Sequence, residues 1–140
     1  MDFGETKKWL NRGRTLQAEI RSLEQAKAEA EARVTKIVVP PKKVIVQSTK
    51  DERRDSGLVE YAESDYVGQI NRRIVDLNGI LDEISRAIYA VDNGTLRQIL
   101  IARYILFRSF EEIAVDMHYG YRNVMKLHKR AVQTISRLRG

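Results

Sequence analysis

The chain of 140 residues contains no cysteine. This absence excludes a disulfide framework, a thiolate metal site and catalysis by a cysteine nucleophile. The only two histidines, His118 and His128, lie ten positions apart and do not indicate a zinc site, so we expect no metal or other cofactor. The sequence also lacks a membrane-length apolar run and a signal-peptide pattern, and we therefore expect a cytoplasmic protein that makes no membrane contact.

Motifs for catalysis are missing as well. The sequence has neither a glycine-rich loop that would cradle a phosphate nor a nucleophile elbow built around a serine. Its carboxylates are not clustered in a way that indicates an acid–base pair. We therefore predict that the chain is not an enzyme.

Acidic residues are absent from the C-terminal end of the chain. Residues 93–140 carry nine basic and three acidic groups, a net charge of +6, whereas residues 58–92 carry three and seven, a net charge of −4. After Asp116 there is no acidic residue, and six basic ones follow: Arg122, Lys126, Lys129, Arg130, Arg137 and Arg139. A helix that carries only positive charge is suited to a polyanion such as DNA.

Signals for a helix-turn-helix coincide with this positive charge. Ser109, three positions before Glu112, forms a capping-box pattern, which predicts a helix that begins at Phe110. The apolar positions of that helix repeat at helical spacing: Phe110, Ile113, Ala114 and Met117. The segment His118-Tyr119-Gly120 interrupts the pattern, so we expect a tight turn there and a second helix that begins near Tyr121.

The helix that begins near Tyr121 has an apolar face and a cationic face. Its inner face is predicted to contain Val124, Leu127, His128, Ala131, Ile135 and Leu138. We read His128 as a hydrogen-bonded packing residue, and Arg137 and Arg139 as a charged tail.

The candidate DNA-binding residues lie at the start of the same helix. They are Tyr121, Arg122, Asn123, Lys126, Lys129 and Arg130. Arginine suits guanine and asparagine suits adenine through paired hydrogen bonds, whereas the lysines suit phosphates. The alternative reading is an ordinary solvated face. Outside this helix, Arg103 is expected to pair with Glu111 or Glu112.

Residues 103–132, RYILFRSFEEIAVDMHYGYRNVMKLHKRAV, carry a family resemblance. They resemble region 4 of bacterial sigma factors and are more closely similar to the sigma-like domain of phage late-transcription regulators of the ArpU/RinA type and related phage proteins. The matching elements are Arg103-Tyr104, Glu111 to Ala114, Met117, Tyr119, Tyr121-Arg122, Val124, Leu127-His128 and Arg130-Ala131.

The close similarity covers residues 96–138 and departs from the family pattern at the turn. The family usually has glycine at the position of His118 and serine at the position of Gly120. The resemblance implies control of late genes. By analogy with sigma region 4, it also implies RNA polymerase as a second partner beside double-stranded DNA.

The first two-thirds of the chain predict a long helical hairpin. The first heptad stripe runs in one unbroken register, with Gly13 and Lys27 as exceptions: Trp9, Leu16, Ile20, Leu23, Ala30, Val34 and Ile37. Prolines 40 and 41 end this helix, and a linker over about 38–58 follows, with a short extended piece at 43–47. The second stripe has no gap: Val67, Ile70, Ile74, Leu77, Leu81, Ile84, Ile88 and Val91. It is expected to end at Asp92-Asn93-Gly94, and Thr95 would cap the next helix, from Leu96 to about Phe107.

These patterns predict an all-α fold with two domains. Residues 1–92 would form the coiled-coil-like helical hairpin, and residues 93–140 a three-helix helix-turn-helix domain that binds DNA. Stripes this narrow are typical of coiled-coil seams, so we expect a homo-oligomer, with a dimer favoured.

Two functions remain open from the sequence. The first is a sequence-specific transcription regulator of phage or prophage late-gene promoters, which reads the major groove with the helix that begins near Tyr121. The alternative is a coiled-coil assembly or adaptor protein, such as a small terminase-like subunit in DNA packaging.

Overall fold

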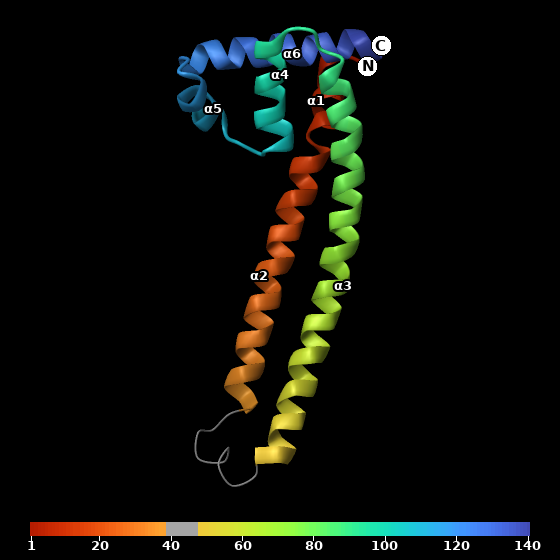
Figure 1. Cartoon of the computed structure of the whole chain (residues 1–140), viewed down its shortest axis with the longest axis vertical. Coiled ribbons are helices and arrows are strands. Elements are labelled where there is room, and N and C mark those ends of the chain that lie inside the picture. Colours follow the sequence, from red (N-terminus) through yellow and green to blue (C-terminus); the bar gives the residue numbers. More distant parts are fainter. Residues whose placement is uncertain (39–47) are drawn as a thin grey trace. The chain divides into compact units, whose positions relative to one another are not determined.

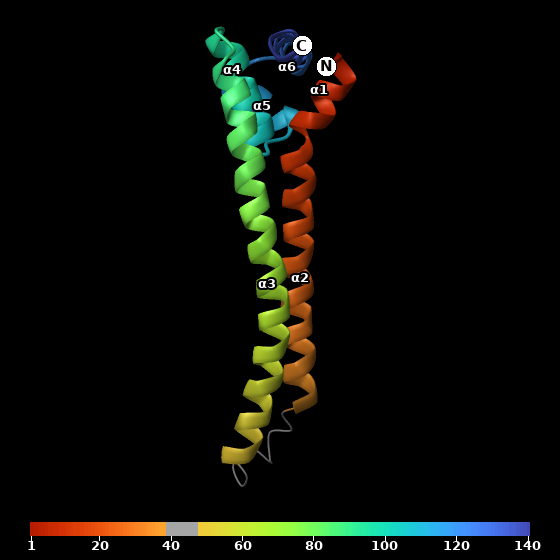
Figure 2. The ribbon, with the colours of Figure 1, turned by 90° about the vertical axis from the view of Figure 1, so that its right-hand side faces the viewer.

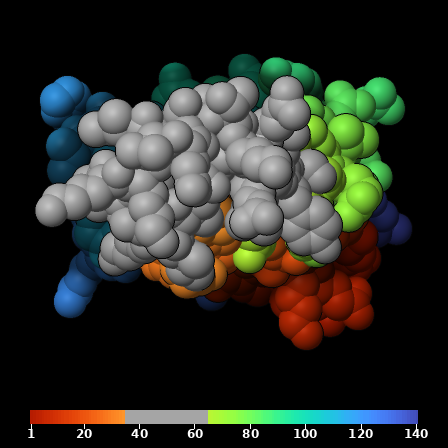
Figure 3. All heavy atoms as spheres, turned by 90° about the horizontal axis from the view of Figure 1, so that it is seen from below, coloured from red at the N-terminus to blue at the C-terminus, as the bar shows by residue number. Residues whose placement is uncertain are grey.

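The computed structural model describes the backbone of residues 1–38 and 48–140 and the side chains of 1–34 and 65–140; residues 35–64 are grey in Figure 3. Every element in this described part is helical (Figure 1), which confirms the all-α class predicted from the sequence. The elements are α1 (Phe3–Leu10), α2 (Arg12–Val38), α3 (Ser48–Tyr89), α4 (Gly94–Leu100), the π-helical turn η1 (Ile101–Ile105), α5 (Phe110–Met117) and α6 (Tyr121–Arg139). Within the described segments, no helix combines the length and the apolar character needed to cross a bilayer.

The N-terminal helical segment is interrupted between Leu10 and Arg12, whereas the heptad pattern predicted one continuous helix in a single register. α1 begins with a capping box in which Glu5 N–H donates to Asp2 at 2.8 Å, and it ends at Leu10, where Asn11 caps it. The interruption allows Leu10, which lies outside the heptad stripe, to become fully buried. The Trp9 ring remains partly exposed and lies under the guanidinium of Arg139, 3.9 Å from its centroid.

One compact unit comprises residues 1–17 and 76–140. Its main core combines side chains from the ends of the predicted hairpin with side chains from the C-terminal helices. The fully or nearly fully buried members are Leu10, Ile84, Ile88, Val91, Leu96, Leu100, Tyr104, Ala131, Val132 and Ile135. The unit therefore does not follow the predicted boundary between residues 92 and 93.

The second compact unit comprises residues 18–75. Here α2 and α3 lie side by side in both ribbon views (Figures 1 and 2). Ile20 and Ile70 are buried, and Arg73 Nε donates to Glu19 Oε1 at 2.8 Å. α2 ends at Val38, as the prolines predicted, but α3 begins at Ser48, so the predicted linker is too long and residues 48–57 are helical. The extended piece expected at 43–47 lies outside the described residues.

The segment after α3 also differs in detail from the prediction. Asn93, not Thr95, is the N-cap of α4, because its side chain accepts from Leu96 N–H at 3.1 Å. α4 continues into η1, which ends at Ile105, two residues before the predicted end at Phe107. Phe107 has a φ of 59°, an unfavourable backbone conformation for a bulky residue. A Cβ added at Gly13 would meet the Phe107 ring at 3.6 Å, an ordinary contact, but would lie only 3.0 Å from the end of the Leu81 side chain, so the glycine makes room chiefly for Leu81.

Candidate nucleic-acid interface

α5 and α6 form a helix pair that packs with α4 around a small second core. Ile99 of α4 packs with Ile113, Ala114 and Val124, all of which are buried. The predicted capping box at the start of α5 is present: Glu112 N–H donates to Ser109 Oγ at 3.1 Å, and Ser109 N–H donates to Glu112 Oε1 at 3.3 Å. The helix therefore begins at Phe110, as the sequence predicted.

The turn between the two helices follows the Schellman pattern. His118 adopts the left-handed conformation, with φ 58° and ψ 38°. Its N–H donates to the carbonyl of Val115 at 3.2 Å, and the N–H of Tyr119 donates to the carbonyl of Ala114 at 3.0 Å. Tyr119 is an exposed residue of this turn.

α6 begins at Tyr121, as predicted, without a side-chain cap. Gly120 is the N-cap residue in an extended conformation, with φ −69°, and no side-chain hydrogen bond caps the helix. The first N–H groups of a helix have no partner within the helix, and they carry its positive dipole end. They are therefore suited to contact an anion together with the cationic side chains beside them.

A buried polar pair fixes the inner face of α6. His128 Nε2 lies 2.6 Å from the hydroxyl of Tyr104, and its ring meets the edge of Phe110 at a centroid distance of 4.8 Å. Burial, reinforced by the charges of Lys7 and Arg103, lowers the pKa of His128 to about 4. Burial also raises the pKa of Tyr104 to about 12. Both groups are therefore neutral at pH 7, and His128 is the hydrogen-bonded packing residue that the sequence predicted.

The residues predicted for DNA binding are all exposed on α6: Tyr121, Arg122, Asn123, Lys126, Lys129 and Arg130. At 100° per residue, Arg122, Lys126 and Lys129 share one face of the helix, with Asn123 and Arg130 at its edge. Tyr121, 48% exposed, lies on the opposite flank of Arg122 from Asn123, so the structure does not place it on this face.

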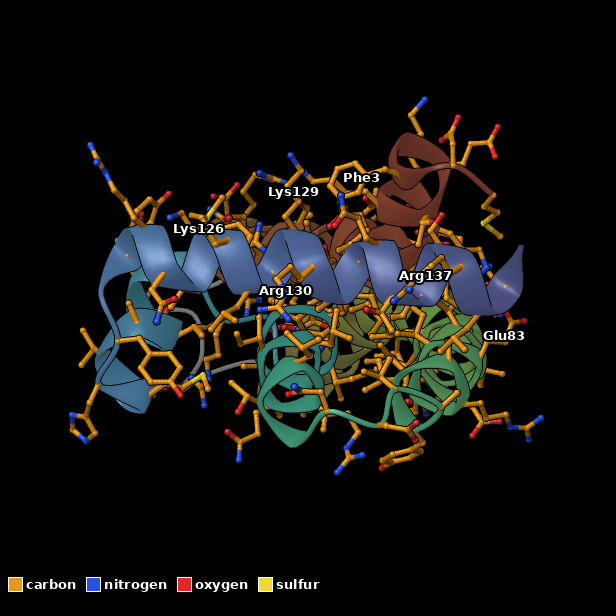
Figure 4. The ribbon with its side chains drawn as sticks, turned by 90° about the horizontal axis from the view of Figure 1, so that it is seen from above. Phe3, Glu83, Lys126, Lys129, Arg130 and Arg137 are labelled. Carbon is orange, nitrogen blue, oxygen red and sulfur yellow. The ribbon has the colours of Figure 1, made fainter. Side chains whose placement is uncertain are left out.

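The exposed face that carries Arg122, Lys126 and Lys129 extends further along α6 than the residues predicted for DNA binding do. Gln133 and Arg137 follow Lys126 and Lys129 at helical spacing, and both are exposed. Figure 4 shows Lys126, Lys129, Arg130 and Arg137 distributed along the helix. Arg130, Thr134 and Arg137 also line an open hollow of about 490 Å³ beside the segment that joins α3 to α4. The sequence does contain a signal for this extension. Basic residues recur seven or eight positions apart, at Arg122, then at Lys129 or Arg130, and then at Arg137.

We call Arg122, Lys126, Lys129, Arg130 and Arg137 the cationic stripe. Among the described side chains, none of the five takes part in an ion pair. α6 contains no acidic residue, so nothing on the helix itself neutralises the stripe. Leu138, which the sequence placed on the inner face, is 56% exposed, because the helix extends beyond the core that covers Ile135.

Three arginines that precede α5 have structural partners instead: Arg97, Arg103 and Arg108. Arg97 donates to the carbonyls of Val91 and Asp92, at 2.8 and 3.1 Å. Arg103 does not form the predicted ion pair; its guanidinium lies 4.0 Å from the centroid of the Phe110 ring, and it donates to the carbonyl of Arg108. The ion pair with Glu112 is made by Arg108, at 3.7 Å.

No family model, curated protein or solved structure matches this chain in the three comparisons. Among the described side chains there is no group of three or more metal-ligating residues. The functional argument therefore rests on the geometry and charge of α5, α6 and the turn between them.

Proposed function

We propose that this chain is a sequence-specific DNA-binding regulator of phage or prophage transcription, which places α6 in the major groove. The observation that carries the proposal is the cationic stripe: five exposed basic side chains on one helix that contains no acidic residue. The tight turn and uncapped start of α6 support it, because the recognition helix of a helix-turn-helix contacts DNA mainly through its first turns.

The residues of α6 divide into two groups by chemistry. Arg122 and Asn123, in the first turn, suit base edges, because arginine and asparagine form paired hydrogen bonds with guanine and adenine. Lys126, Lys129 and Arg130 suit phosphates, which position the helix without reading sequence. The open N–H groups at the start of α6 add a contact to a phosphate.

The length of the stripe favours a helix that lies along the groove. Arg122 and Arg137 are fifteen residues apart, which corresponds to about 22 Å at 1.5 Å per residue. This is longer than the major groove is wide, about 12 Å. At 3.4 Å per base pair, the stripe matches about six to seven base pairs.

Late-gene control and contact with RNA polymerase come from the resemblance to the sigma-like phage regulators. They belong to the proposal as the expected biological setting. The competing function is a packaging adaptor, which would form large oligomers and show weak sequence preference.

The test is selection of bound duplexes from the genome that encodes the chain, followed by titration of the selected and random duplexes. A regulator should prefer the selected duplex by roughly 10³-fold or more. Equal affinity for both duplexes would contradict sequence-specific regulation, and no binding at low salt would refute DNA binding altogether.

Variants assign the contacts. Lys126→Ala should weaken binding to all duplexes and reduce the salt slope by about one unit, whereas Arg122→Ala should relax preference at one base pair. The matched control is Arg86→Ala, which removes one positive charge from an exposed residue of α3 whose ion pair is with Asp82. If Arg86→Ala weakened binding as much as Lys126→Ala did, net charge rather than the cationic stripe would explain the affinity.

A further inference from the structure

Three basic side chains from different elements lie near one another in the compact unit of residues 1–17 and 76–140: Lys7 of α1, Arg14 of α2 and Arg103 of η1. The charges of Lys7 and Arg103 add to the effect of burial on the pKa of His128. Those of Arg103 and Arg14 oppose the effect of burial on the pKa of Tyr104. Tyr104 and His128 form the buried hydrogen-bonded pair, so the three cations lie close to the same part of the core. We call them the flank cluster.

The flank cluster is not neutralised by the protein around it. Among the described side chains, none of its three members takes part in an ion pair. Burial and the charge of Arg14 lower the pKa of Arg103, and they outweigh the opposite effect of the nearby Glu111 carboxylate. Like charges that are brought together repel, and a bound anion would relieve this repulsion.

The two arginines of the flank cluster are held in position and keep donors for a ligand. Arg14 Nη1 donates to the carbonyl of Arg103 at 3.3 Å, and Arg103 Nη1 donates to the carbonyl of Arg108 at 3.1 Å. A guanidinium has five N–H donors, and these bonds use one donor of each. Both arginines are partly exposed and Lys7 is exposed, so the remaining donors are open to an anion from outside.

The flank cluster lies on the side of α6 that faces α1. The hydroxyl of Ser136 donates to the carbonyl of Met1, which marks that side of the helix. Lys129, a member of the cationic stripe, precedes Ser136 by seven residues and therefore shares this side. Tyr121 lies on the same flank at the start of α6, and Arg103 is close enough to it for their charges to interact. The flank cluster thus adjoins the cationic stripe along this side of the helix.

Cations therefore lie on both sides of α6. Figure 4 shows α1 on one side of the helix, with Phe3 near Lys129. On the other side, Arg130 and Arg137 line the hollow beside the segment that joins α3 to α4. An α-helix with its side chains is about 10–12 Å across, and the major groove is about 12 Å wide. A helix that fills the groove therefore has one phosphate backbone immediately on each side.

We propose that the flank cluster binds the phosphate backbone of one DNA strand while α6 lies in the major groove. The inference rests on the proposed function and deepens it, because it assigns the strand beside α1 to residues outside the recognition helix. Arg130 and Arg137 then face the backbone of the complementary strand. Ammonium and guanidinium groups donate strongly to phosphate oxygens, and such contacts position a protein without reading sequence.

The first experiment measures the affinity of the full chain for its selected duplex and for random duplexes at several salt concentrations. Lys7→Gln and Arg14→Gln each remove one charge, so each should weaken binding to all duplexes and reduce the salt slope by about one unit. The preference between the duplexes should not change. Glutamine at position 14 still has a donor for the carbonyl of Arg103, so Arg14→Gln tests the charge apart from that hydrogen bond.

The matched control is Lys8→Gln, which removes the same charge from the neighbouring exposed position of α1. Position 8 is turned by about 100° around the helix from position 7, so the control should keep more of the wild-type slope than Lys7→Gln does. An equal effect of the control would show that net charge, not the flank cluster, explains the affinity.

Two other results separate the inference from the proposed function. Wild-type slopes in both Lys7→Gln and Arg14→Gln, together with a reduced slope in Lys126→Ala, would refute the flank cluster and leave DNA binding by α6 in place. If the wild-type chain bound no duplex at low salt, the proposed function and the inference would both be wrong.

Duplexes in which single phosphates are replaced by neutral methylphosphonates assign the strand. A variant that has lost its contact should no longer respond to the loss of charge at the phosphate concerned, as in a double-mutant cycle. The phosphates assigned in this way by Lys7→Gln and Arg14→Gln should lie on one strand, and those assigned by Arg130→Gln on the other. Assignment of all three variants to the same strand would contradict the proposed arrangement.

Discussion

The buried Tyr104–His128 pair should make the protein lose stability as the pH falls below neutrality. The pKa of His128 is about 4 in the folded protein, whereas an unperturbed histidine has a pKa near 6.5. The unfolded chain therefore binds the proton more readily than the folded protein does. The stability contributed by the neutral histidine is complete above pH 6.5, decreases as the pH falls from 6.5 to 4, and is lost below that.

The size of the effect follows from the difference between the two pKa values. A difference of about 2.5 units, at 1.36 kcal/mol per unit, corresponds to about 3 kcal/mol of unfolding free energy. The neighbouring charges lower the pKa as well, because the positive charges of Lys7 and Arg103 both disfavour protonation of His128. Stabilities of small domains are of order 5–15 kcal/mol, so a loss of this size is readily measured.

The assay is urea denaturation at several pH values between 7.5 and 4, followed by circular dichroism. Carboxyl groups also titrate in this range, so the comparison is with His128→Gln, which cannot be protonated. The wild-type protein should lose about 3 kcal/mol more than this variant does between pH 7 and pH 4. The control is His118→Asn, which removes the exposed histidine and keeps a residue tolerated in the left-handed turn.

A direct measurement completes the test. The imidazole resonance of His128 should titrate near pH 4 in the folded protein. A midpoint between 6 and 7, or an equal loss of stability in wild type and His128→Gln, would show that the pair is not desolvated as the structure indicates.

Three further predictions concern the turn, the core and the cationic stripe. His118→Gly should raise the unfolding free energy by about 1 kcal/mol by relieving the left-handed strain, whereas Gly120→Ala, at an extended residue with open space around it, should change it much less; equal effects in denaturation would contradict this account of the turn. Leu10→Ala should cost about 2–5 kcal/mol in the same assay, and Leu138→Ala should cost less than about 1 kcal/mol, since Leu10 is fully buried and Leu138 is exposed. Arg137→Ala should weaken binding to all duplexes and reduce the salt slope by about one unit; an unchanged slope would limit the DNA contact to the first half of α6.

Local signals in the sequence predicted α5, the turn after it and the start of α6 well. The capping box of Ser109 and Glu112, the turn at His118 and the start of α6 at Tyr121 are all present. Each depends on hydrogen bonds between residues that are three to five positions apart, so the neighbouring residues are sufficient to specify it. The distribution of charge along α6 is likewise a property of the sequence.

Heptad periodicity predicted burial less well, because it assumes that a neighbouring helix covers every position of the apolar stripe. It omitted Leu10, and it did not distinguish the buried Ile70 from the half-exposed Ile74. In the same way, the helical spacing of α6 placed Leu138 inside, although that side chain is exposed. Heptad periodicity also gave no sign that residues 1–17 and 76–92 share a core with the C-terminal helices. Which position of a stripe is covered depends on where the neighbouring helix lies.

The amino-acid order alone therefore determined the all-α class seen in the described residues, the caps and turn around α5, and a final helix without acidic residues. Tertiary structure decided what each helix face meets: His128 against Tyr104, and Arg103 over Phe110 instead of beside a carboxylate. The physical reason is the distance along the sequence between the groups that interact. Caps and turns are satisfied within a few residues, whereas burial and charge pairing require groups that are distant in the sequence to come together.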